Sequence, residues 1–280
     1  MQLISTAAKA SHHAGNEIKK SERGGVGMEN TFLLNGKTAL ITGSSQGIGK
    51  AIAIGMAEAG ADIALVARNA DKLSAVKEEV EALGRKCLSF KADISNIDEI
   101  TDVFSKTEAA FGKLDILVNS AGTYNQKPAE DMTPADWDEV LDLNAKSLFF
   151  CCQQAGKIML RNGGGRIINI ASTFGVVGFA GRIPYNASKA AVISITQTLA
   201  LEWSKKGINV NSIAPGPVWT EGRDELFSNP DHYAKATAKL AIGRVAKPKE
   251  LAGPAVFLAS DAASFVTGTT LLVDGGYCAQ

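Results

Sequence analysis

The sequence predicts one α/β domain in which a doubly wound, seven-stranded parallel sheet carries helices on both faces. From Gly36 onward, short apolar runs alternate with longer amphipathic runs. Most of the short runs are rich in Ile, Leu and Val with little polar alternation, which is typical of strands that are covered on both faces. The length of 280 residues lies at the upper edge of a single α/β domain. Strand–helix–strand units with right-handed crossovers build such a sheet.

The predicted strands and helices alternate along the chain. The strands are expected at residues 38–42, 62–67, 87–91, 115–119, 166–171, 209–214 and 270–273. The helices are expected near residues 47–59, 70–83, 97–111, 136–161, 185–206 and 249–260. Several helices are followed by a glycine in the position where a left-handed residue ends a helix, namely Gly60, Gly84, Gly112 and Gly207. Ligands bind this fold outside the carboxyl ends of the strands, so the residues after each strand are candidate binding residues.

Two segments fall outside this alternation. Residues 1–30 are polar and Gly-rich and lack the apolar core of a secretory signal. We expect a disordered extension, or a non-native one that arises by translation from a start upstream of Met28; a transit peptide is the alternative. The domain then covers residues 31–280. Within it, residues 218–247 follow the sixth strand with few strand signals and are expected to form a lid over the binding crevice, the alternative being a mobile surface excursion.

Charge and composition argue against several classes of partner. Lys plus Arg and Asp plus Glu both number 29, so net charge gives no case for a nucleic-acid or anionic-membrane partner. No apolar run approaches the ~20 residues that span a bilayer, and a cytoplasmic protein is expected. Four cysteines without a CxxC pair and three histidines argue against a zinc site. The cysteines are expected to be buried thiols in a reducing compartment.

A glycine-rich turn follows the first predicted strand. It reads Thr-Gly-Ser-Ser-Gln-Gly-Ile-Gly-Lys over residues 42–50. In this position glycines let the chain turn sharply and approach a pyrophosphate, while the following helix offers free N–H groups to the anion. A triphosphate-binding P-loop would need a second glycine followed directly by Lys and Ser or Thr, whereas Lys50 is followed by Ala51. The turn therefore predicts a dinucleotide cofactor.

The end of the second predicted strand indicates which dinucleotide binds. An NAD enzyme usually presents a carboxylate to the ribose 2′-hydroxyl here, but the sequence has Ala67 and Arg68. A guanidinium pairs with a 2′-phosphate through a charge-assisted contact, so NADP(H) is favoured over NAD(H); the alternative is that Arg68 is an exposed loop arginine. Asp93, after the third strand, is either an acceptor for the adenine amino group or an ordinary loop aspartate.

Tyr185 and Lys189 lie four residues apart, which puts them on one face of the predicted helix. A phenol is a weak base near neutral pH, and an ammonium at ~4 Å favours its anion by on the order of 4 kcal/mol at an effective dielectric constant of about 20. With Lys189 beside it, Tyr185 can donate or accept the proton when a ketone and an alcohol interconvert. Taken alone, such a pair is usually surface decoration.

With these motifs in this order, residues 32–277 resemble the short-chain dehydrogenase/reductase family, which has a Rossmann fold. The glycine turn matches the family's T-G-x3-G-x-G, residues 119–122 match its N-N-A-G except for Ser120, and residues 215–220 match its P-G-x3-T. The resemblance implies a catalytic tetrad of Asn144, Ser172, Tyr185 and Lys189 and no metal. With the residue arguments above, it gives a cofactor-binding set of Gly43, Ser45, Gln46, Gly47, Ile48, Gly49, Arg68, Asp93, Ile94, Asn119, Ala121, Gly122, Tyr185, Lys189, Pro215, Gly216, Val218 and Thr220.

Two further tetrad residues have implied roles. Ser172 would donate a hydrogen bond to the substrate oxygen and stabilise negative charge on it. Asn144 would hold a water that joins Lys189 to solvent. Taken singly, Ser172 could cap a loop, Thr173 could supply the hydroxyl instead, and Asn144 could cap a helix. The joint spacing with the glycine turn favours the catalytic roles.

The expected function is an NADP(H)-dependent oxidoreductase that interconverts a ketone and a secondary alcohol, with 3-oxoacyl thioesters as one substrate class. A sugar or polyol dehydrogenase that uses NAD(H) or NADP(H) is the alternative, because carrier-protein reductases typically have a basic residue where this chain has Leu201. A non-catalytic dinucleotide sensor is a more distant alternative function. A serine hydrolase built on Ser172 would need the Gly-x-Ser-x-Gly elbow, which is absent. The resemblance also implies a homotetramer formed through the helices near 144–161 and 185–206.

Overall fold

A computed structural model describes residues 31–279 of the chain. All strands of its sheet run parallel, in the order β3-β2-β1-β4-β5-β6-β7. The strands within this part of the chain are β1 (Thr38–Thr42), β2 (Asp62–Ala67), β3 (Cys87–Lys91), β4 (Ile116–Asn119), β5 (Gly165–Ile170), β6 (Ile208–Pro215) and β7 (Thr270–Val273). The seven-stranded, doubly wound fold that the sequence predicts is confirmed. The expectation for residues 1–30 lies outside the described residues.

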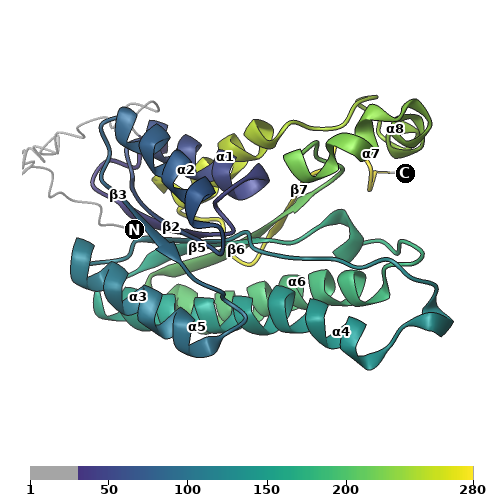
Figure 1. Ribbon diagram of the computed structural model, residues 1–280. Helices are drawn as coiled ribbons and strands as arrows, with labels where there is room; N and C mark the ends of the chain where they lie inside the picture. Colours follow the sequence, from purple (N-terminus) through teal and green to yellow (C-terminus); the bar gives the residue numbers. More distant parts are fainter. Residues whose placement is uncertain (1–30, 280) are drawn as a thin grey trace, which may run out of the picture.

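Helices cover the sheet in two layers, one on each face (Figure 1). One layer packs α1, α2 and α9 against the sheet, and the other packs α3, α5 and α6. Their bounds are α1 (Gly47–Glu58), α2 (Ala70–Ala82), α9 (Ala252–Ala259), α3 (Ile97–Phe111), α5 (Ser147–Arg161) and α6 (Ile183–Trp203). No helix within residues 31–279 is long and apolar enough to cross a membrane.

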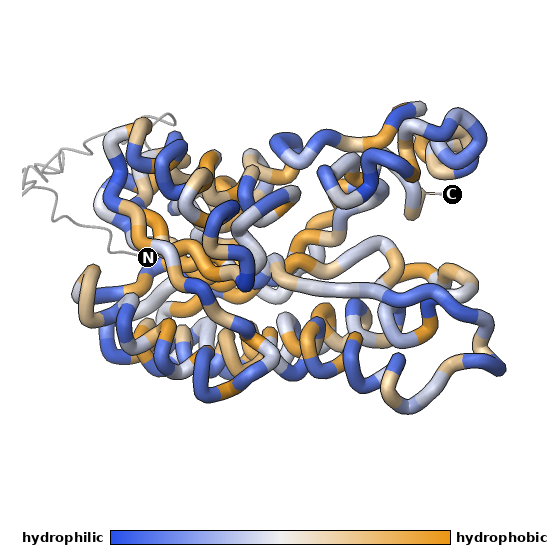
Figure 2. The backbone as a smooth tube through the Cα atoms, in the orientation of Figure 1, coloured by the Kyte–Doolittle hydropathy of each residue, from blue (hydrophilic) through white to orange (hydrophobic). Residues whose placement is uncertain are grey.

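The first strand shows why these strands lack polar alternation. Ala39 and Ile41 belong to one apolar core, and Leu40 between them belongs to the other, because successive side chains of a strand point to opposite faces. All residues of β1 are buried. Figure 2 shows hydrophobic residues gathered in the strands between the two helical layers. A sheet covered on both faces therefore has two separate cores.

The strand order reverses at β1, which pairs with β2 on one side and with β4 on the other. The connections that leave β1 and β4 run to opposite faces, so a crevice opens at the carboxyl ends of these strands. The hydroxyl oxygen of Thr42 accepts hydrogen bonds from the backbone N–H groups of Ser120 at 3.1 Å and Ala121 at 3.3 Å. This side chain ties the two sides of the crevice together at its base.

The helix expected near residues 136–161 begins slightly earlier than expected and contains a π-helical turn that the sequence did not indicate. α4 (Pro134–Leu141) begins earlier because Thr133 and Asp136 form a capping box and Pro134 occupies the first turn. A π-helical turn, Asp142–Lys146, then joins α4 to α5. A π turn inserts a single extra residue, which changes the hydropathy periodicity too little to be detected. The sequence pattern therefore predicts one uninterrupted α-helix here.

The segment after β6 contains two short helices that the sequence analysis did not predict, α7 (Asp224–Ser228) and α8 (Pro230–Thr237). The Asn229 side chain caps α8 by accepting hydrogen bonds from the first two N–H groups that follow its proline. Val218 and Ala246 form an isolated parallel bridge at the base of the segment. Helices this short show too few turns for a periodic pattern, so their absence from the prediction is understandable.

The thiols of the described part of the chain are unpaired. Cys87, Cys151 and Cys152 are buried as expected, whereas Cys278 is half-buried. Burial raises the pKa of Cys87 and of Cys152 to about 12, so these side chains are neutral and pack as small apolar groups. Over the same residues, no group of three or more His, Cys, Asp or Glu side chains could hold a metal ion.

Candidate active site

A cleft of about 1180 Å³ opens at the carboxyl ends of the strands. Residues that follow β1 through β6 line it, although they are far apart in the sequence. Every cofactor-binding residue that the sequence predicts lines the cleft except Asn119. Ser172, Tyr185 and Lys189 line it as well, whereas Asn144 is buried and does not. The fold therefore brings most of the predicted site into one cavity.

The Asn119 side chain does not line the cleft and instead points toward the layer of α3, α5 and α6. Its role in cofactor binding stays a prediction. Its amide nitrogen donates to Asn169 Oδ1 at 2.9 Å and contacts Cys152 Sγ at 3.2 Å. Asn169 in turn donates to Thr196 Oγ1 on α6 at 2.9 Å. This buried network joins β4 and β5 to the helices beneath the cleft. The next residue, Ser120, lines the cleft instead.

The turn between β1 and α1 brings the backbone to the edge of the cleft. Gly43 has a φ of +66°, and a Cβ atom there would lie 2.7 Å from the Cα atom of Ala121. A Cβ atom on Gly49 would overlap the carbonyl oxygen of Gly43. Glycine alone fits such close backbone packing. Gln46 precedes α1 without a side-chain cap, which leaves N–H groups at the start of the helix for a ligand.

A carboxylate of the chain already lies at the start of α1. Oε2 of Glu221 accepts a hydrogen bond from the N–H group of Gly47 at 3.0 Å. A helix N-terminus carries partial positive charge and binds anions, so this carboxylate stands in for a phosphate oxygen. The residues present therefore fit the diphosphate of a dinucleotide, which would have to displace Glu221.

The end of the cleft beyond β2 is basic. Arg68 and Lys72 line it, and Nη1 of Arg68 lies 3.9 Å from the Asp93 carboxylate. Lys72 donates to Oε1 of Gln46 at 2.6 Å. A backbone hydrogen bond from Ser95 lowers the pKa of Asp93, burial opposes this, and the Ser95 hydroxyl and Arg68 lower it further. Asp93 is therefore ionised, and two exposed cations remain within reach of a phosphate group.

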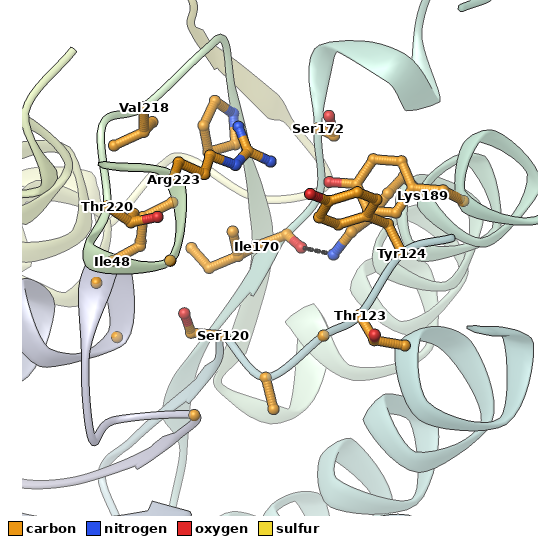
Figure 3. Close-up of a pocket in the computed structure, with 18 of the residues that line it drawn as sticks. Ile48, Ser120, Thr123, Tyr124, Ile170, Ser172, Lys189, Val218, Thr220 and Arg223 are labelled. Carbon is orange, nitrogen blue, oxygen red and sulfur yellow. Dashed lines mark hydrogen bonds between the residues drawn. The ribbon is translucent and has the colours of Figure 1, made fainter. Parts of the chain in front are cut away.

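Tyr185 and Lys189 share one face of α6, as the spacing predicts. The Lys189 ammonium lies 5.7 Å from the centre of the Tyr185 ring and donates to the Ile170 carbonyl oxygen at 2.8 Å, the dashed line in Figure 3. Lys189 is 5% exposed, and burial lowers its pKa from 10.5 to about 8. A lysine has three N–H donors, so this buried cation can donate to further groups in the cleft.

Ser172 follows β5 and caps a short 3₁₀ turn, Thr173–Gly175. Its hydroxyl oxygen accepts from the Phe174 N–H at 3.1 Å, so its hydrogen stays free to be donated. A Cβ atom on Gly175 would lie 2.6 Å from the backbone of Lys189. The turn is thus pressed against α6, which fixes the Ser172 hydroxyl relative to the tyrosine helix. The Ser172 side chain thus caps the 3₁₀ turn and also lines the cleft.

Asn144 lies in the π turn and is 1% exposed. Its amide nitrogen donates to the Thr123 carbonyl oxygen at 2.8 Å and to Ser188 Oγ at 3.0 Å, and its amide oxygen accepts from the Thr123 N–H at 2.8 Å. Both amide hydrogens are therefore used within the protein. A water joined to this side chain could only donate to the remaining lone pair of the amide oxygen. The geometry makes Asn144 a brace between the loop after β4 and α6.

Three cleft residues near Tyr185 were missed by the sequence analysis: Tyr124, Arg182 and Arg223. The rings of Tyr124 and Tyr185 have centroids 6.2 Å apart. Arg182 precedes Tyr185 by three residues at the start of α6. This spacing places both side chains near one another on the helix and could have indicated that Arg182 belongs to the site. Tyr124 and Arg223 come from loops that only the fold brings to this helix.

Residues 42–278 match the model of a family described as enoyl-(acyl carrier protein) reductase. The chain belongs to the short-chain dehydrogenase/reductase family. The resemblance that the motifs indicated is therefore confirmed. As a short-chain dehydrogenase/reductase, the protein is an oxidoreductase of alcohols or their carbonyl counterparts.

Relatives of similar length differ in substrate. A 2-dehydro-3-deoxy-D-gluconate 5-dehydrogenase of Dickeya dadantii is 45% identical over 253 residues, 90% of this chain and 99% of the relative. A 3-oxoacyl-(acyl-carrier-protein) reductase of Staphylococcus aureus is 37% identical over 241 residues, 86% and 97% of the two chains. The crystal structure of a gluconate 5-dehydrogenase from Burkholderia cenocepacia in complex with NADP and tartrate has a TM-score of 0.85 and 35% identity, covering 89% of this chain and 98% of that chain.

We predict that replacing Lys189 by Met changes how the stability of the cofactor-free protein depends on pH. The pKa of Lys189 is about 8 in the folded state against an ordinary 10.5, so the unfolded chain binds more protons between these values and stability rises with pH there. The wild type should gain about 3 kcal/mol over Lys189→Met between roughly pH 7 and pH 10.5.

Chemical denaturation of both proteins across this pH range measures the difference. Lys206→Met, which removes an exposed lysine away from the cleft, is the matched control and should keep a constant offset from the wild type. A constant offset for Lys189→Met as well would contradict the desolvated ammonium.

Proposed function

We propose that this chain is an NADP(H)-dependent dehydrogenase that interconverts a ketone and a secondary alcohol on a polyhydroxylated substrate. The observation that carries the proposal is the arrangement along one cleft. Ser172, Tyr185 and Lys189 lie at one end, and the glycine-lined turn lies at the other. A proton-transfer group, an oxyanion donor and an anion cradle are the parts that such a reaction needs.

Each of these side chains then has a step to perform. A bound nicotinamide supplies or accepts the hydride. Tyr185 gives its phenolic proton to the carbonyl oxygen during reduction and takes the proton of the hydroxyl during oxidation. Ser172 donates a hydrogen bond to the same oxygen. The buried ammonium of Lys189 favours the tyrosine anion, and Asn144 holds the surrounding loop against α6.

A preference for NADP(H) over NAD(H) is supported by the charge at the ribose end of the cleft. Arg68 follows β2 where a carboxylate would hold the ribose 2′-hydroxyl of NAD, and Lys72 adds a second cation one helical turn further on. Both groups can pair with a 2′-phosphate. The related gluconate 5-dehydrogenase from Burkholderia cenocepacia was crystallised with NADP.

A sugar or polyol type of substrate is supported over an acyl-carrier-protein thioester. The Dickeya dadantii relative named for a sugar acid is 45% identical, and the Staphylococcus aureus relative named for a carrier protein is 37% identical. Leu201 on α6 is 86% exposed and offers no cation to an acidic carrier protein at that position.

Residues 218–247 are proposed to act as the lid of the cleft. Phe227, Leu240 and Val245 form a small apolar core whose neighbours are Trp219, Tyr233 and Ala236 of the same segment and Tyr277 near the C-terminal end. The segment thus has its own core, which is anchored to the chain after β7. Arg223 and Phe227 line the cleft, and Glu221 contacts the start of α1. The bridge between Val218 and Ala246 holds both ends of the lid together.

We also propose a homotetramer, as the family resemblance implies. Large apolar side chains are exposed on α5, on α6 and at the β7 edge of the sheet, among them Leu160, Leu201 and Leu272. Helices and edge strands with exposed apolar groups are suited to burial against another copy. Sedimentation that shows a monomer at micromolar concentration would contradict this assembly.

Replacing Tyr185 by Phe tests the reaction itself, because it removes the proton donor and keeps the ring. We expect kcat/KM to fall about 100- to 10,000-fold, with unchanged binding of NADPH. NADPH oxidation with sugar-derived ketones and acyl thioesters, and NADP⁺ reduction with sugars and polyols, measure the activity. Turnover near the wild-type rate would overturn the assignment, and an unchanged melting temperature guards against a folding defect.

Replacing Arg68 by Ala tests the cofactor preference. We expect the KM for NADPH to rise about tenfold or more, on the order of 1.4 kcal/mol, while the KM for NADH barely changes. Steady-state kinetics with both coenzymes measure this difference. Lys77→Ala, which alters an exposed lysine of α2 that pairs with Glu81, is the control. An equal effect of Arg68→Ala on both coenzymes would contradict a 2′-phosphate contact.

Replacing Glu221 by Gln tests whether the lid carboxylate competes with the coenzyme for α1. Removing its charge should tighten NADPH binding about threefold to tenfold, since a charge at a helix N-terminus contributes ~1 kcal/mol. Fluorescence titration measures the dissociation constant. Glu225→Gln, an exposed neighbour on α7, should leave it unchanged. Weaker binding by Glu221→Gln would mean that Glu221 holds the coenzyme rather than opposing it.

A further inference from the structure

Two arginines converge on one aromatic ring at the reacting end of the cleft. The guanidinium carbon of Arg182 lies 4.4 Å from the centre of the Tyr124 ring, and that of Arg223 lies 5.7 Å from it. Arg182 comes from the start of α6, and Arg223 comes from the 3₁₀ turn Glu221–Arg223 in the lid. Figure 3 shows Tyr124 and Arg223 in the same pocket as Ser172 and Lys189. Both cations therefore belong to the substrate end of the cleft.

Neither arginine has a carboxylate partner among residues 31–279. Arg182 donates from Nη2 to the Gln126 side-chain oxygen at 3.2 Å, and its Nε is buried without a hydrogen-bond partner. The Arg223 guanidinium makes no hydrogen bond within the described part of the chain. Among the described residues that line the cleft, Asp93 is the one acidic residue, and it lies beside Arg68. The nearby Glu221 carboxylate is bound to the N–H group of Gly47.

Contacts with aromatic rings explain part of this arrangement, but they leave donors unused. Arg182 also lies 5.4 Å from the Phe179 ring centre, and such contacts stabilise a cation through the faces of the rings. The N–H groups point along the edges of the guanidinium plane, where a carboxylate or phosphate binds with two parallel hydrogen bonds. An unpartnered buried N–H group is costly. Contacts with aromatic rings alone do not account for the unpartnered Nε of Arg182.

The two positive charges also repel each other. Burial lowers the pKa of the Arg182 guanidinium, and the charge of Arg223 lowers it as well, against an opposing influence of Tyr124 and Tyr185. Holding like charges together in a partly desolvated cleft is unfavourable until an anion joins them.

We propose that Arg182 and Arg223 bind a carboxylate of the substrate, so that the enzyme acts on small hydroxylated or oxo acids in preference to uncharged polyols. This inference rests on the proposed dehydrogenase function and adds the substrate's charged group to it. The ring centroids of Tyr124 and Tyr185 are 6.2 Å apart. A carboxylate held by these arginines would therefore be close to Tyr185, which suits a short-chain sugar acid.

The test compares two ligands with the same four-carbon diol skeleton. Tartrate ends in carboxylates and threitol of matching configuration ends in uncharged hydroxymethyl groups, so they differ in the group that the arginines would bind. Calorimetry on the NADP⁺-loaded enzyme measures the affinity for each. Arg182→Gln and Arg223→Gln should each weaken tartrate binding about tenfold or more, the scale of one lost charge-assisted contact. Threitol binding should stay unchanged.

Arg161→Gln is the matched control, since it removes an arginine that pairs with Glu108 on the outer helices, and it should bind both ligands like the wild type. Melting temperature and NADP⁺ affinity identify a variant that does not fold. If Arg182→Gln fails to fold, Arg223→Gln, in a short lid turn, still decides the result.

Three outcomes would overturn the proposal: variants that keep wild-type tartrate affinity, variants that lose tartrate and threitol alike, or a wild type that binds NADP⁺ but prefers threitol. A phosphate group has similar hydrogen-bond chemistry, so acetoacetyl-coenzyme A, which carries phosphates and no carboxylate, is the third ligand of the test. Loss of its binding with retained tartrate binding would assign the arginines to a phosphate instead. Failure of the dehydrogenase function itself would appear as absent NADP⁺ binding or absent turnover. Failure of the carboxylate proposal alone would appear as unchanged tartrate affinity in variants that still bind NADP⁺.

Discussion

The hydrogen bond from the buried ammonium of Lys189 to the Ile170 carbonyl oxygen holds the reacting end of the cleft together. It fastens α6 to the last residue of β5, and Ser172 follows two residues further along the chain. Because the ammonium is desolvated, its pKa is lowered, and its remaining donors attract groups that carry or can acquire negative charge. The helix presents Tyr185 one turn away. A strand end, a helix and the side chain that is proposed to transfer the proton thus depend on one polar contact.

The chain carries no net charge, yet its cleft is cationic. Arg68 and Lys72 line one end, Arg182 and Arg223 line the other, and Lys189 lies at the reacting end with them. The net charge of the whole sequence does not show how the charges are distributed in space. A cleft with low-dielectric walls focuses the electric field of the charges that line it. The charges of the cleft therefore suit the phosphates of the proposed dinucleotide at one end and the proposed anionic substrate at the other.

In the proposed function, reaction chemistry and substrate choice come from different parts of this fold. Ser172, Tyr185 and Lys189 lie at a strand end and on a long helix, which are rigid elements. Tyr124 comes from the loop after β4, and Arg223 comes from the segment after β6. A scaffold of this kind keeps the hydride-transfer geometry while its loops change the group that is recognised. This division agrees with relatives of similar length that bear the names of a sugar-acid dehydrogenase and a carrier-protein reductase.

By itself, the sequence determined the order of strands and helices, the glycine turn and the Tyr185–Lys189 pair, because each depends on residues within a short stretch of chain. Tertiary structure alone decided that Asn119 faces the helices, that a π turn brings Asn144 inward, and that Glu221 and Arg223 reach the cleft. These positions depend on contacts between residues far apart in the chain. Local periodicity contains no information about which distant loop lies above a strand end; the packing of the helices on the sheet sets it.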